Sequence, residues 1–242
     1  VKPCMLFTKV VLTGDYPHTA LGKKEIKYPG YHELAYLHPN VFTPDERILE
    51  ILGVKKGEKY VIVRFVAWEA SHDIGHSGIS NENKIKLVNT LSKHLRVFIS
   101  SEAELPEELK KFQINVPAEQ MHNALAYAHM YIGEGATMAE ECSILGTPAI
   151  HVNPLTGGLI EELEQYEILY YFNNSLDDQY KAINLASQIA QNNNIKREII
   201  LKRDKMLNDK IDVTKFLIWF INCYPLSTKI VKAHNFNHDK FK

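Results

Sequence analysis

From residue 60 onward, short apolar runs alternate with amphipathic stretches. The apolar runs predict strands at 60–67, 95–100, 130–132, 148–152 and 168–172, with 112–114 as a short additional strand. The amphipathic stretches predict helices at 81–94, 117–128, 137–145, 159–165 and 175–191, the last with Ser175 as N-cap. Strands that alternate with helices through short connections form right-handed βαβ units. The predicted fold is therefore α/β: a Rossmann-like parallel sheet with helices on both faces.

The two ends of the chain have a different pattern. Glycine and proline recur too often before residue 40 for long elements, but the aromatic residues of YPGYHELAYLHPN (28–40) indicate an ordered connector. Thr43 and Pro44 predict the start of a short helix that Gly53 ends. Terminal helices are predicted at 195–206 and 213–224. The second is apolar nearly all round, so we expect it to be buried on more than one side.

Composition narrows the possible classes of protein. The chain has 242 residues, of which 28 are basic and 29 acidic, so it carries no positive charge excess that would indicate nucleic-acid binding. No apolar run reaches the roughly 18–20 residues of a membrane-spanning helix. The three cysteines lack metal-binding or redox spacing, which favours reduced thiols in the cytoplasm. The chain begins Val-Lys-Pro without a signal-peptide pattern, and we expect a cytoplasmic fragment of a longer protein.

The stretch YIGEGATMAEECSILGTPAIHVN (131–153) is the first candidate site. In an open parallel sheet, ligands bind beyond the carboxyl ends of the strands. Gly133, Gly135 and Ala136 allow a ligand to approach the backbone, and Thr137 is predicted to cap the following helix, whose positive end suits a phosphate. Glu140 and Glu141 follow in the first turns of that helix, and one of them is placed to accept hydrogen bonds from a ribose. The alternative is that this Gly-x-Gly turn only starts a helix, with its glutamates stabilising the dipole.

A second cluster of chemistry-bearing residues follows the first predicted strand, in RFVAWEASHD (64–73). Arg64 offers a bidentate fork for an anion, and Trp68 a flat face for a base or sugar. His72 beside Asp73 forms a candidate general acid–base pair. The alternative is structural: Arg64 pairs with Asp73, Trp68 packs, and His72 caps a helix. The His72, Asp73 and His76 spacing is weak evidence for a metal, and we predict no metal site.

The stretch EGATMAEECSILGTPAI resembles the nucleotide-binding motif in the C-terminal domain of GT-B-type proteins, above all the UDP-N-acetylglucosamine 2-epimerases. The chain is more similar still to an uncharacterised archaeal and bacterial family of GT-B-like proteins, through YPGYHELAYLHPN, VRFVAWEASHD and DVTKFLIWFINCYP. The resemblance covers most of the chain and implies the C-terminal half of a GT-B architecture. Residues 1–43 would then be the remnant of an N-terminal domain with its connector, 44–225 a nucleotide-sugar-binding domain, and 226–242 a tail.

This resemblance implies a function as well. The chain would bind a UDP-sugar as half of a glycosyltransferase or sugar-nucleotide epimerase, inactive by itself and without a cofactor. Gly135, Ala136 and Thr137 would donate to the diphosphate, and Glu141 would hold the ribose. The missing N-terminal domain or a partner chain would cover helix 213–224. The sequence departs from the epimerase pattern at Glu134, and it lacks a Ser-Gly-Gly run. The alternative is a non-catalytic nucleotide-binding or regulatory module of the same fold.

Overall fold

The computed structural model describes residues 4–68, 77–233 and 236–242. The chain divides into two compact units, each of which we describe by itself. The sheet unit comprises Pro44–Thr156 and Ile160–Arg203, and the terminal unit comprises Val1–Thr43, Gly157–Leu159 and Asp204–Lys242.

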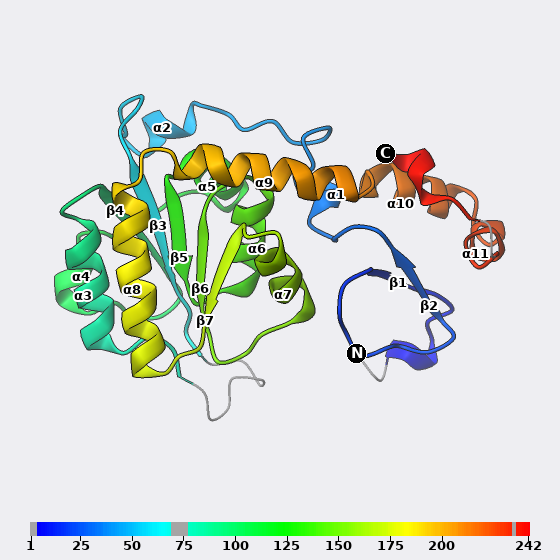
Figure 1. Cartoon of the computed structure of the whole chain (residues 1–242), viewed down its shortest axis with the longest axis horizontal. Helices are drawn as coiled ribbons and strands as arrows, with labels where there is room; N and C mark the ends of the chain where they lie inside the picture. Colours follow the sequence, from blue (N-terminus) through cyan, green and yellow to red (C-terminus); the bar gives the residue numbers. More distant parts are fainter. Residues whose placement is uncertain (1–3, 69–76, 234–235) are drawn as a thin grey trace. The chain divides into compact units, whose positions relative to one another are not determined.

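The core of the sheet unit is a five-stranded parallel sheet (Figure 1). The strand order is β4-β3-β5-β6-β7, made of β3 (Tyr60–Phe65), β4 (Arg96–Ser101), β5 (Met130–Gly133), β6 (Ala149–Val152) and β7 (Leu169–Phe172). Five of the predicted strands are thereby confirmed. The additional strand at 112–114 is wrong, because that segment forms only one isolated bridge, between Ile99 and Gln113. The N–H of Phe112 is instead used in the turn that follows Leu109.

Helices cover both faces of this sheet, which confirms the predicted α/β class (Figure 1). On one face α3 (Asn81–Leu91) packs against α8 (Leu176–Gln191), and on the other α5 (Met121–Tyr127) packs against α6 (Ala136–Ile144). The Ser175 cap is confirmed, since its side chain accepts a hydrogen bond from the Asp178 N–H at 3.1 Å. The remaining short elements are α2 (Ile48–Ile51), α4 (Glu107–Lys110), α7 (Gly158–Gln165) and the 3-10 helix η2 (Ala118–Gln120).

The predicted helix start at Thr43 is wrong. Helix α2 begins at Ile48, because Asp45 turns the chain first: its carboxylate accepts a hydrogen bond from the Arg47 N–H at 3.0 Å. The Asp45 N–H in turn donates to the side-chain oxygen of Asn123 at 2.9 Å. The predicted stop at Gly53 agrees with its left-handed φ of 61°, which glycine adopts readily after a helix.

The strand order contains a topological switch point. β3 is the first strand of the sheet unit, with β4 on one side of it and β5 on the other. The chain runs from β3 to β4 on one side and then crosses to β5 on the other side of β3, so the strand order reverses at β3. In open α/β sheets the ligand crevice lies at such a reversal. The carboxyl ends of β3 and β5 carry both candidate clusters found in the sequence.

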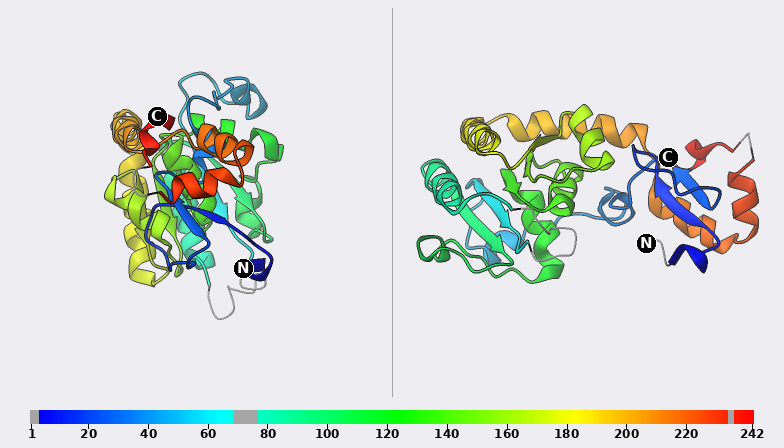
Figure 2. Two further views of the ribbon diagram at one scale, coloured as in Figure 1. Left: turned by 90° about the vertical axis from the view of Figure 1, so that its right-hand side faces the viewer. Right: turned by 90° about the horizontal axis from the view of Figure 1, so that it is seen from below.

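The terminal unit contains a two-stranded parallel pair, β1 (Val11–Gly14) and β2 (Glu25–Tyr28), which lie side by side in Figures 1 and 2. Sequence analysis missed these strands, because each has only four residues and the intervening segment contains turn-forming Pro17 and Gly22. The other elements are η1 (Cys4–Leu6), α1 (Leu34–Leu37), α10 (Val213–Asn222), α11 (Leu226–Val231) and η3 (His238–Phe241). Helix α9 (Ile195–Asp209) is shared between the two units.

Helix α10 groups with the N-terminal segment in the terminal unit. Val213, Phe216 and Phe220 are buried. The Phe216 ring lies 5.4 Å from Tyr28 and also 5.4 Å from Phe241, so the predicted tail takes part in this core. The outer face of α10 is exposed within the described chain, with 57% of Ile218 accessible to solvent. The expectation of burial on more than one side is therefore not met here.

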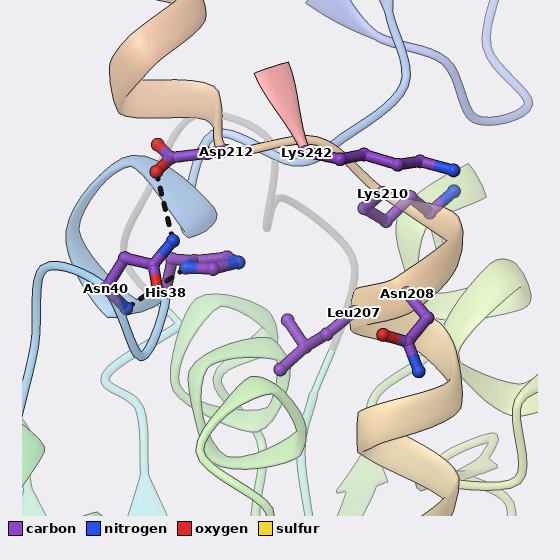
Figure 3. A pocket seen from close by; sticks show the side chains of 7 residues that line it. All are labelled: His38, Asn40, Leu207, Asn208, Lys210, Asp212 and Lys242. Atoms are coloured by element: carbon purple, nitrogen blue, oxygen red, sulfur yellow. Dashed lines mark hydrogen bonds between the residues drawn. The ribbon is translucent and has the colours of Figure 1, made fainter. Parts of the chain in front are cut away.

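A polar pocket of about 240 Å³ lies where α10 begins (Figure 3). Its lining residues are His38, Asn40, Leu207, Asn208, Lys210, Asp212 and Lys242. The buried Asp212 carboxylate caps α10 by accepting from the Lys215 N–H at 3.0 Å, and it also accepts from the Asn40 side chain at 3.2 Å. Lys210 lies over the Tyr31 ring, 4.7 Å from its centroid. These contacts link the connector to the start of α10, and they account for Asn40, Lys210 and Asp212 in the pocket lining.

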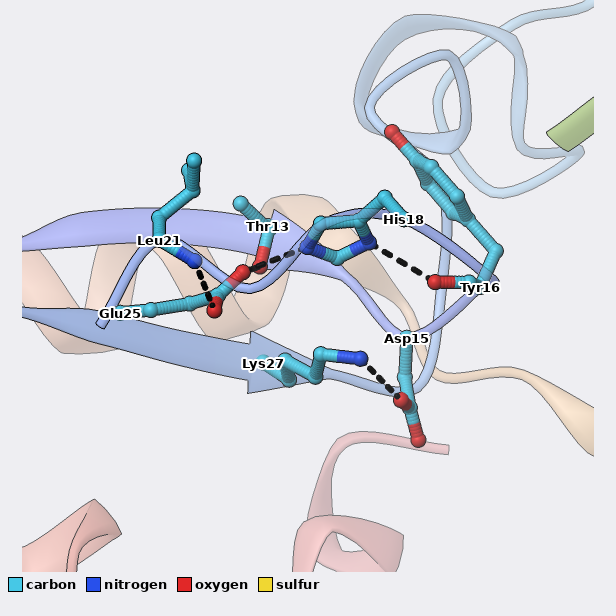
Figure 4. A network of polar contacts seen from close by, with 7 residues as sticks. All are labelled: Thr13, Asp15, Tyr16, His18, Leu21, Glu25 and Lys27. Carbon is cyan, nitrogen blue, oxygen red and sulfur yellow. Dashed lines mark hydrogen bonds and ion pairs between the residues drawn. The ribbon is translucent and has the colours of Figure 1, made fainter. Parts of the chain in front are cut away.

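A polar network around Glu25 links β1, β2 and the segment between them (Figure 4). One carboxylate oxygen lies 2.5 Å from His18 Nε2 and accepts from the Thr13 hydroxyl at 2.9 Å, and the other accepts from the Leu21 N–H at 2.9 Å. His18 Nδ1 lies 2.8 Å from the Tyr16 carbonyl. Both ring nitrogens therefore face acceptors, an arrangement that suits the doubly protonated imidazolium. Accordingly, the hydrogen bond to Glu25 raises the pKa of His18.

In the ranges described above, no helix is both long and apolar enough to cross a membrane.

Candidate functional site

The turn between β5 and α6 lies at the switch point. β5 ends at Gly133, Gly135 occupies the N-cap position with φ −86° and ψ 118°, and α6 begins at Ala136. The Ala139 N–H donates to the Gly135 carbonyl at 3.3 Å, which is the first bond of the helix. The N–H groups of the preceding three residues have no partner within the helix, as in any first turn. The helix therefore presents backbone donors and its positive end beyond the sheet.

The prediction that Thr137 caps this helix is wrong. Thr137 is the second helical residue, it is exposed, and no side chain caps α6 at Gly135. The helix starts earlier because the Tyr131 hydroxyl holds the Gly135 carbonyl at 3.2 Å, directly after the strand. Since Gly135 supplies no capping oxygen, the first-turn donors are not satisfied by a cap.

The two glycines of the turn, Gly133 and Gly135, differ in how much space surrounds them. A Cβ on Gly133 would come within 2.7 Å of the Arg64 carbonyl and 2.6 Å of the Tyr131 hydroxyl, so a larger residue does not fit between β5 and β3. A Cβ on Gly135 would meet nothing closer than 3.7 Å, which is ordinary contact. Gly133 is thus explained by strand packing, whereas the place beside Gly135 would accept a methyl group in ordinary contact.

Arg64 lies next to the turn but is already paired. Its Cγ is the nearest atom to the Cβ position of Gly135, at 3.7 Å. The guanidinium donates to the Ser100 hydroxyl at 2.6 Å and to the carboxylate of Glu102. The structure therefore identifies Glu102, which sequence analysis missed, as the partner of Arg64. It lies on the neighbouring β4 side of the sheet, and only the strand order reveals that proximity.

Trp68 is oriented with its indole nitrogen toward the turn. Its φ of 58° lies in the left-handed region, which is unfavourable for a bulky residue and marks a constrained position. The buried Nε1 lies beside the Glu134 carboxylate, whose pKa is raised by burial, and the two groups do not form a hydrogen bond of normal geometry. Both groups contact Gly78, where a Cβ would lie 2.4 Å from Nε1. The nitrogen-bearing edge of the Trp68 ring therefore packs against Glu134 and Gly78.

Glu134, the residue that departs from the epimerase pattern, is buried and only 1% exposed. Its carboxylate accepts hydrogen bonds from the Val66 N–H at 2.8 Å and from the Ile79 N–H at 2.6 Å. Burial raises the pKa of Glu134, against the opposing effects of Lys84 and of these two N–H donors. The carboxylate is therefore engaged with the backbone around β3 and α3.

Glu141 lies one helical turn after Thr137 on α6. Its carboxylate is 3.0 Å from His122 Nε2 at the start of α5, and the side chain is 12% exposed. His122 is not among the site residues expected from the sequence. The packing of α5 against α6 makes it a neighbour of the predicted ribose ligand. A carboxylate has several lone-pair directions, so this contact leaves acceptor capacity.

His151 is a further residue that sequence analysis missed. It lies on β6 in register with Gly133, and it is completely buried. Neither ring nitrogen has a hydrogen-bond partner of normal geometry within the described ranges. Burial lowers the pKa of His151 to about 4, and the nearby Gly133 backbone opposes the shift. The imidazole is therefore neutral under the β5–α6 turn. An isolated histidine in an apolar strand was the only available signal.

The candidate catalytic pair, His72 and Asp73, lies outside the described residues, as does His76. Within the described part of the chain, no three His, Cys, Asp or Glu side chains are grouped so that they could hold a metal ion. The structure brings together Arg64, Trp68 and the Gly133–Thr137 turn, with Glu141 farther along the same helix.

Comparison with known proteins agrees with this architecture. The family described as "Protein of unknown function (DUF354)" matches residues 10–215. No curated protein matches the chain.

Solved structures with the same fold are available. A UDP-N-acetylglucosamine 2-epimerase is 13% identical with a TM-score of 0.52, and the match covers 85% of this chain and 54% of that one. MnaA of S. aureus, solved with UDP, is 13% identical with a TM-score of 0.50 over 74% of this chain and 48% of its own. The glycotransferase of kitacinnamycin has a TM-score of 0.48 at 10% identity, over 69% and 44%. The chain spans about half the length of these proteins. At such identities, the first two of these matches show a shared fold and nothing more.

Proposed function

The chain belongs to the DUF354 family, and we propose that it is the nucleotide-sugar-binding half of a GT-B-like glycosyltransferase or sugar-nucleotide epimerase. The nucleotide is a UDP-sugar or a related donor. Its diphosphate lies at the turn from Gly133 to Thr137, and its ribose lies at Glu141.

The observation that carries this proposal is the helix start at the switch point. α6 begins beyond the carboxyl end of β5 without a side-chain cap, and Gly135 puts no side chain beside its own backbone. Backbone donors and a positive helix end in that place form a site for a dianionic group. These donors also stabilise the charge that develops on a diphosphate when a glycosidic bond to it breaks. No resident metal or organic cofactor is part of this proposal.

Glu141 and His122 supply the second contact. Ribose hydroxyls donate to the Glu141 carboxylate, whose orientation is held by His122 at 3.0 Å. Arg64 and Trp68 line the adjacent side of the site. His72 and Asp73 are the proposed general acid–base pair. The partner in the complete protein is the preceding half of the GT-B architecture, which we place against the exposed apolar residues Ile218, Ile221, Tyr224 and Leu226 of α10 and its continuation.

Calorimetric titration of the 242-residue chain with UDP, UDP-N-acetylglucosamine, GDP and ADP tests the proposal. We expect UDP to bind, and Glu141→Ala to weaken the binding about tenfold or more, because a charge-assisted hydrogen bond to the ribose is lost. Glu140→Ala is the matched control, since it removes the same charge from the same helix without the ribose contact. Absence of UDP binding by the folded chain would overturn the proposal. Equal losses in both variants would remove Glu141 from the ribose site.

A further inference from the structure

We infer that Glu134 is a positioning residue, which holds the β5–α6 turn in the geometry that presents its backbone donors to the diphosphate. This inference rests on the proposed function of that turn. Glu134 lies directly before the N-cap residue Gly135, so the orientation of its peptide groups determines where the first-turn N–H groups point.

Every hydrogen-bonding group of Glu134 is used. Its N–H donates to the Arg64 carbonyl at 3.0 Å, and its carbonyl accepts from the Asn153 side chain at 2.7 Å. Its two carboxylate oxygens accept from the Val66 and Ile79 N–H groups at 2.8 and 2.6 Å. One residue is thereby tied to the end of β3, to the chain that follows it, to the chain entering α3 and to the chain leaving β6.

The surroundings of the carboxylate permit little movement. Glu134 is 1% exposed, and a Cβ on Gly78 would lie 1.9 Å from its Oε1, so the chain entering α3 lies directly against the side chain. The edge of Trp68 closes the same place. A buried charge is costly unless it is hydrogen-bonded, and here backbone donors from two separate segments supply the bonds. A residue that only began a helix would not need such an anchor.

The role of Glu134 follows from the direction of its side chain. A carboxylate exposed at the turn would repel a diphosphate. In this structure the carboxylate is buried against Val66 and Ile79, which leaves the start of α6 to its backbone donors. Misplacing a binding group by about 1 Å costs up to about 100-fold in rate in enzymes, so such an anchor affects binding strongly.

The test uses Glu134→Gln in the 242-residue chain, with Thr147→Val as a matched control. Gln has the same shape but replaces one acceptor with a donor that faces a backbone N–H. Thr147 is also fully buried and donates to the Leu125 carbonyl at 2.8 Å, but it lies at the amino end of β6, away from the turn. The measurements are the ¹H–¹⁵N peaks of Gly135 and Ala136 in the free protein, UDP affinity by calorimetry, and thermal unfolding.

In Glu134→Gln we expect the Gly135 and Ala136 peaks to shift and UDP affinity to fall about 10- to 100-fold. Thr147→Val should lose stability but keep both the peak positions and the affinity. Unmoved peaks with wild-type affinity in Glu134→Gln would overturn the inference, as would an equal loss of affinity in Thr147→Val. If the wild-type chain binds no UDP, the proposed function fails, whereas shifted peaks would still support the anchor.

A second variant covers the case in which Glu134→Gln does not fold. Asn153→Ala removes the hydrogen bond to the Glu134 carbonyl from a half-buried position, together with the bond that Asn153 Oδ1 accepts from the Leu155 N–H at 2.8 Å. It should move the same two peaks and weaken UDP binding by a smaller factor. Unchanged peaks and affinity in this variant would count against the anchor.

Discussion

Glu25 in the terminal unit and Glu134 in the sheet unit both accept several hydrogen bonds, yet their pKa values shift in opposite directions. The hydrogen bond from His18 and then the Leu21 N–H lower the pKa of Glu25 to about 2. Burial raises the pKa of Glu134 despite two backbone donors. The number of hydrogen bonds is similar, so it does not decide the sign. A cationic partner near solvent favours the carboxylate, whereas neutral donors in the core do not fully replace its hydration.

This difference separates two ways in which a polar group organises a small piece of backbone. The Glu25 network uses an ion pair to close the segment between β1 and β2. Glu134 uses buried backbone donors to fix the turn at the switch point. Ion pairs near the surface contribute little to stability, while a buried donor left without a partner costs much more. Three predictions test the contrast, beginning with the largest effect.

Removing the two carboxylates should have unequal effects on folding. Glu134→Ala leaves the Val66 and Ile79 N–H groups unpaired, at a cost of about 1–3 kcal/mol for each that stays dry. Glu25→Ala should lower the free energy of unfolding less, because His18 and Leu21 can turn to water. Urea unfolding of both variants measures the difference. Equal losses would show that the two networks do not differ in the way described.

The close fit around the Glu134 anchor predicts a contrast between neighbouring glycines. Gly133→Ala places a methyl group 2.7 Å from the Arg64 carbonyl and should destabilise the protein by about 1–3 kcal/mol. Gly135→Ala meets nothing within 3.7 Å and should change stability by less than about 0.5 kcal/mol. The same urea experiment, with circular dichroism as readout, ranks the two. The reverse ranking would contradict the packing at β3.

The smallest effect is on the pH dependence of stability, and its sign differs between the two residues. Glu25 has a lowered pKa, so its stabilisation is present above the ordinary value of 4.5 and is lost as pH falls toward about 2. His18 has a raised pKa, so its share is present below 6.5 and is lost as pH rises through the folded value. This network therefore stabilises most between about 4.5 and 6.5.

Glu134 has a raised pKa, so the folded chain keeps its proton where the unfolded chain has lost it. Its contribution to stability therefore increases as pH falls through the folded pKa toward 4.5. Urea midpoints between about pH 3 and 8 for wild type, Glu25→Gln and Glu134→Gln separate the two contributions. Glu25→Gln should reduce the loss on the acid side, and Glu134→Gln should remove the opposite slope. Parallel profiles in all three proteins would refute both assignments.

Local pattern was sufficient for most of the sheet unit. The apolar runs of β3 and β5, the amphipathic pattern of α8 and its Ser175 cap are each contained within a few consecutive residues, so periodicity and capping chemistry predict them. The same reasoning failed at Thr43 and Thr137. Both can cap a helix, but a distant contact with Asn123 in the first case, and the Tyr131 side chain four residues before Gly135 in the second, moved the helix starts.

The sequence by itself determined the α/β class, the strands and the position of the small-residue turn after β5. These features depend on side-chain periodicity and on the small residues between Gly133 and Thr137. Only the tertiary structure decided which partners meet there. Arg64 pairs with Glu102, and Glu141 with His122. The Glu134 carboxylate pairs with the backbone N–H groups of Val66 after β3 and of Ile79 before α3. These contacts join segments between 19 and 68 residues apart, and strand order, which a single sequence does not encode locally, sets their proximity.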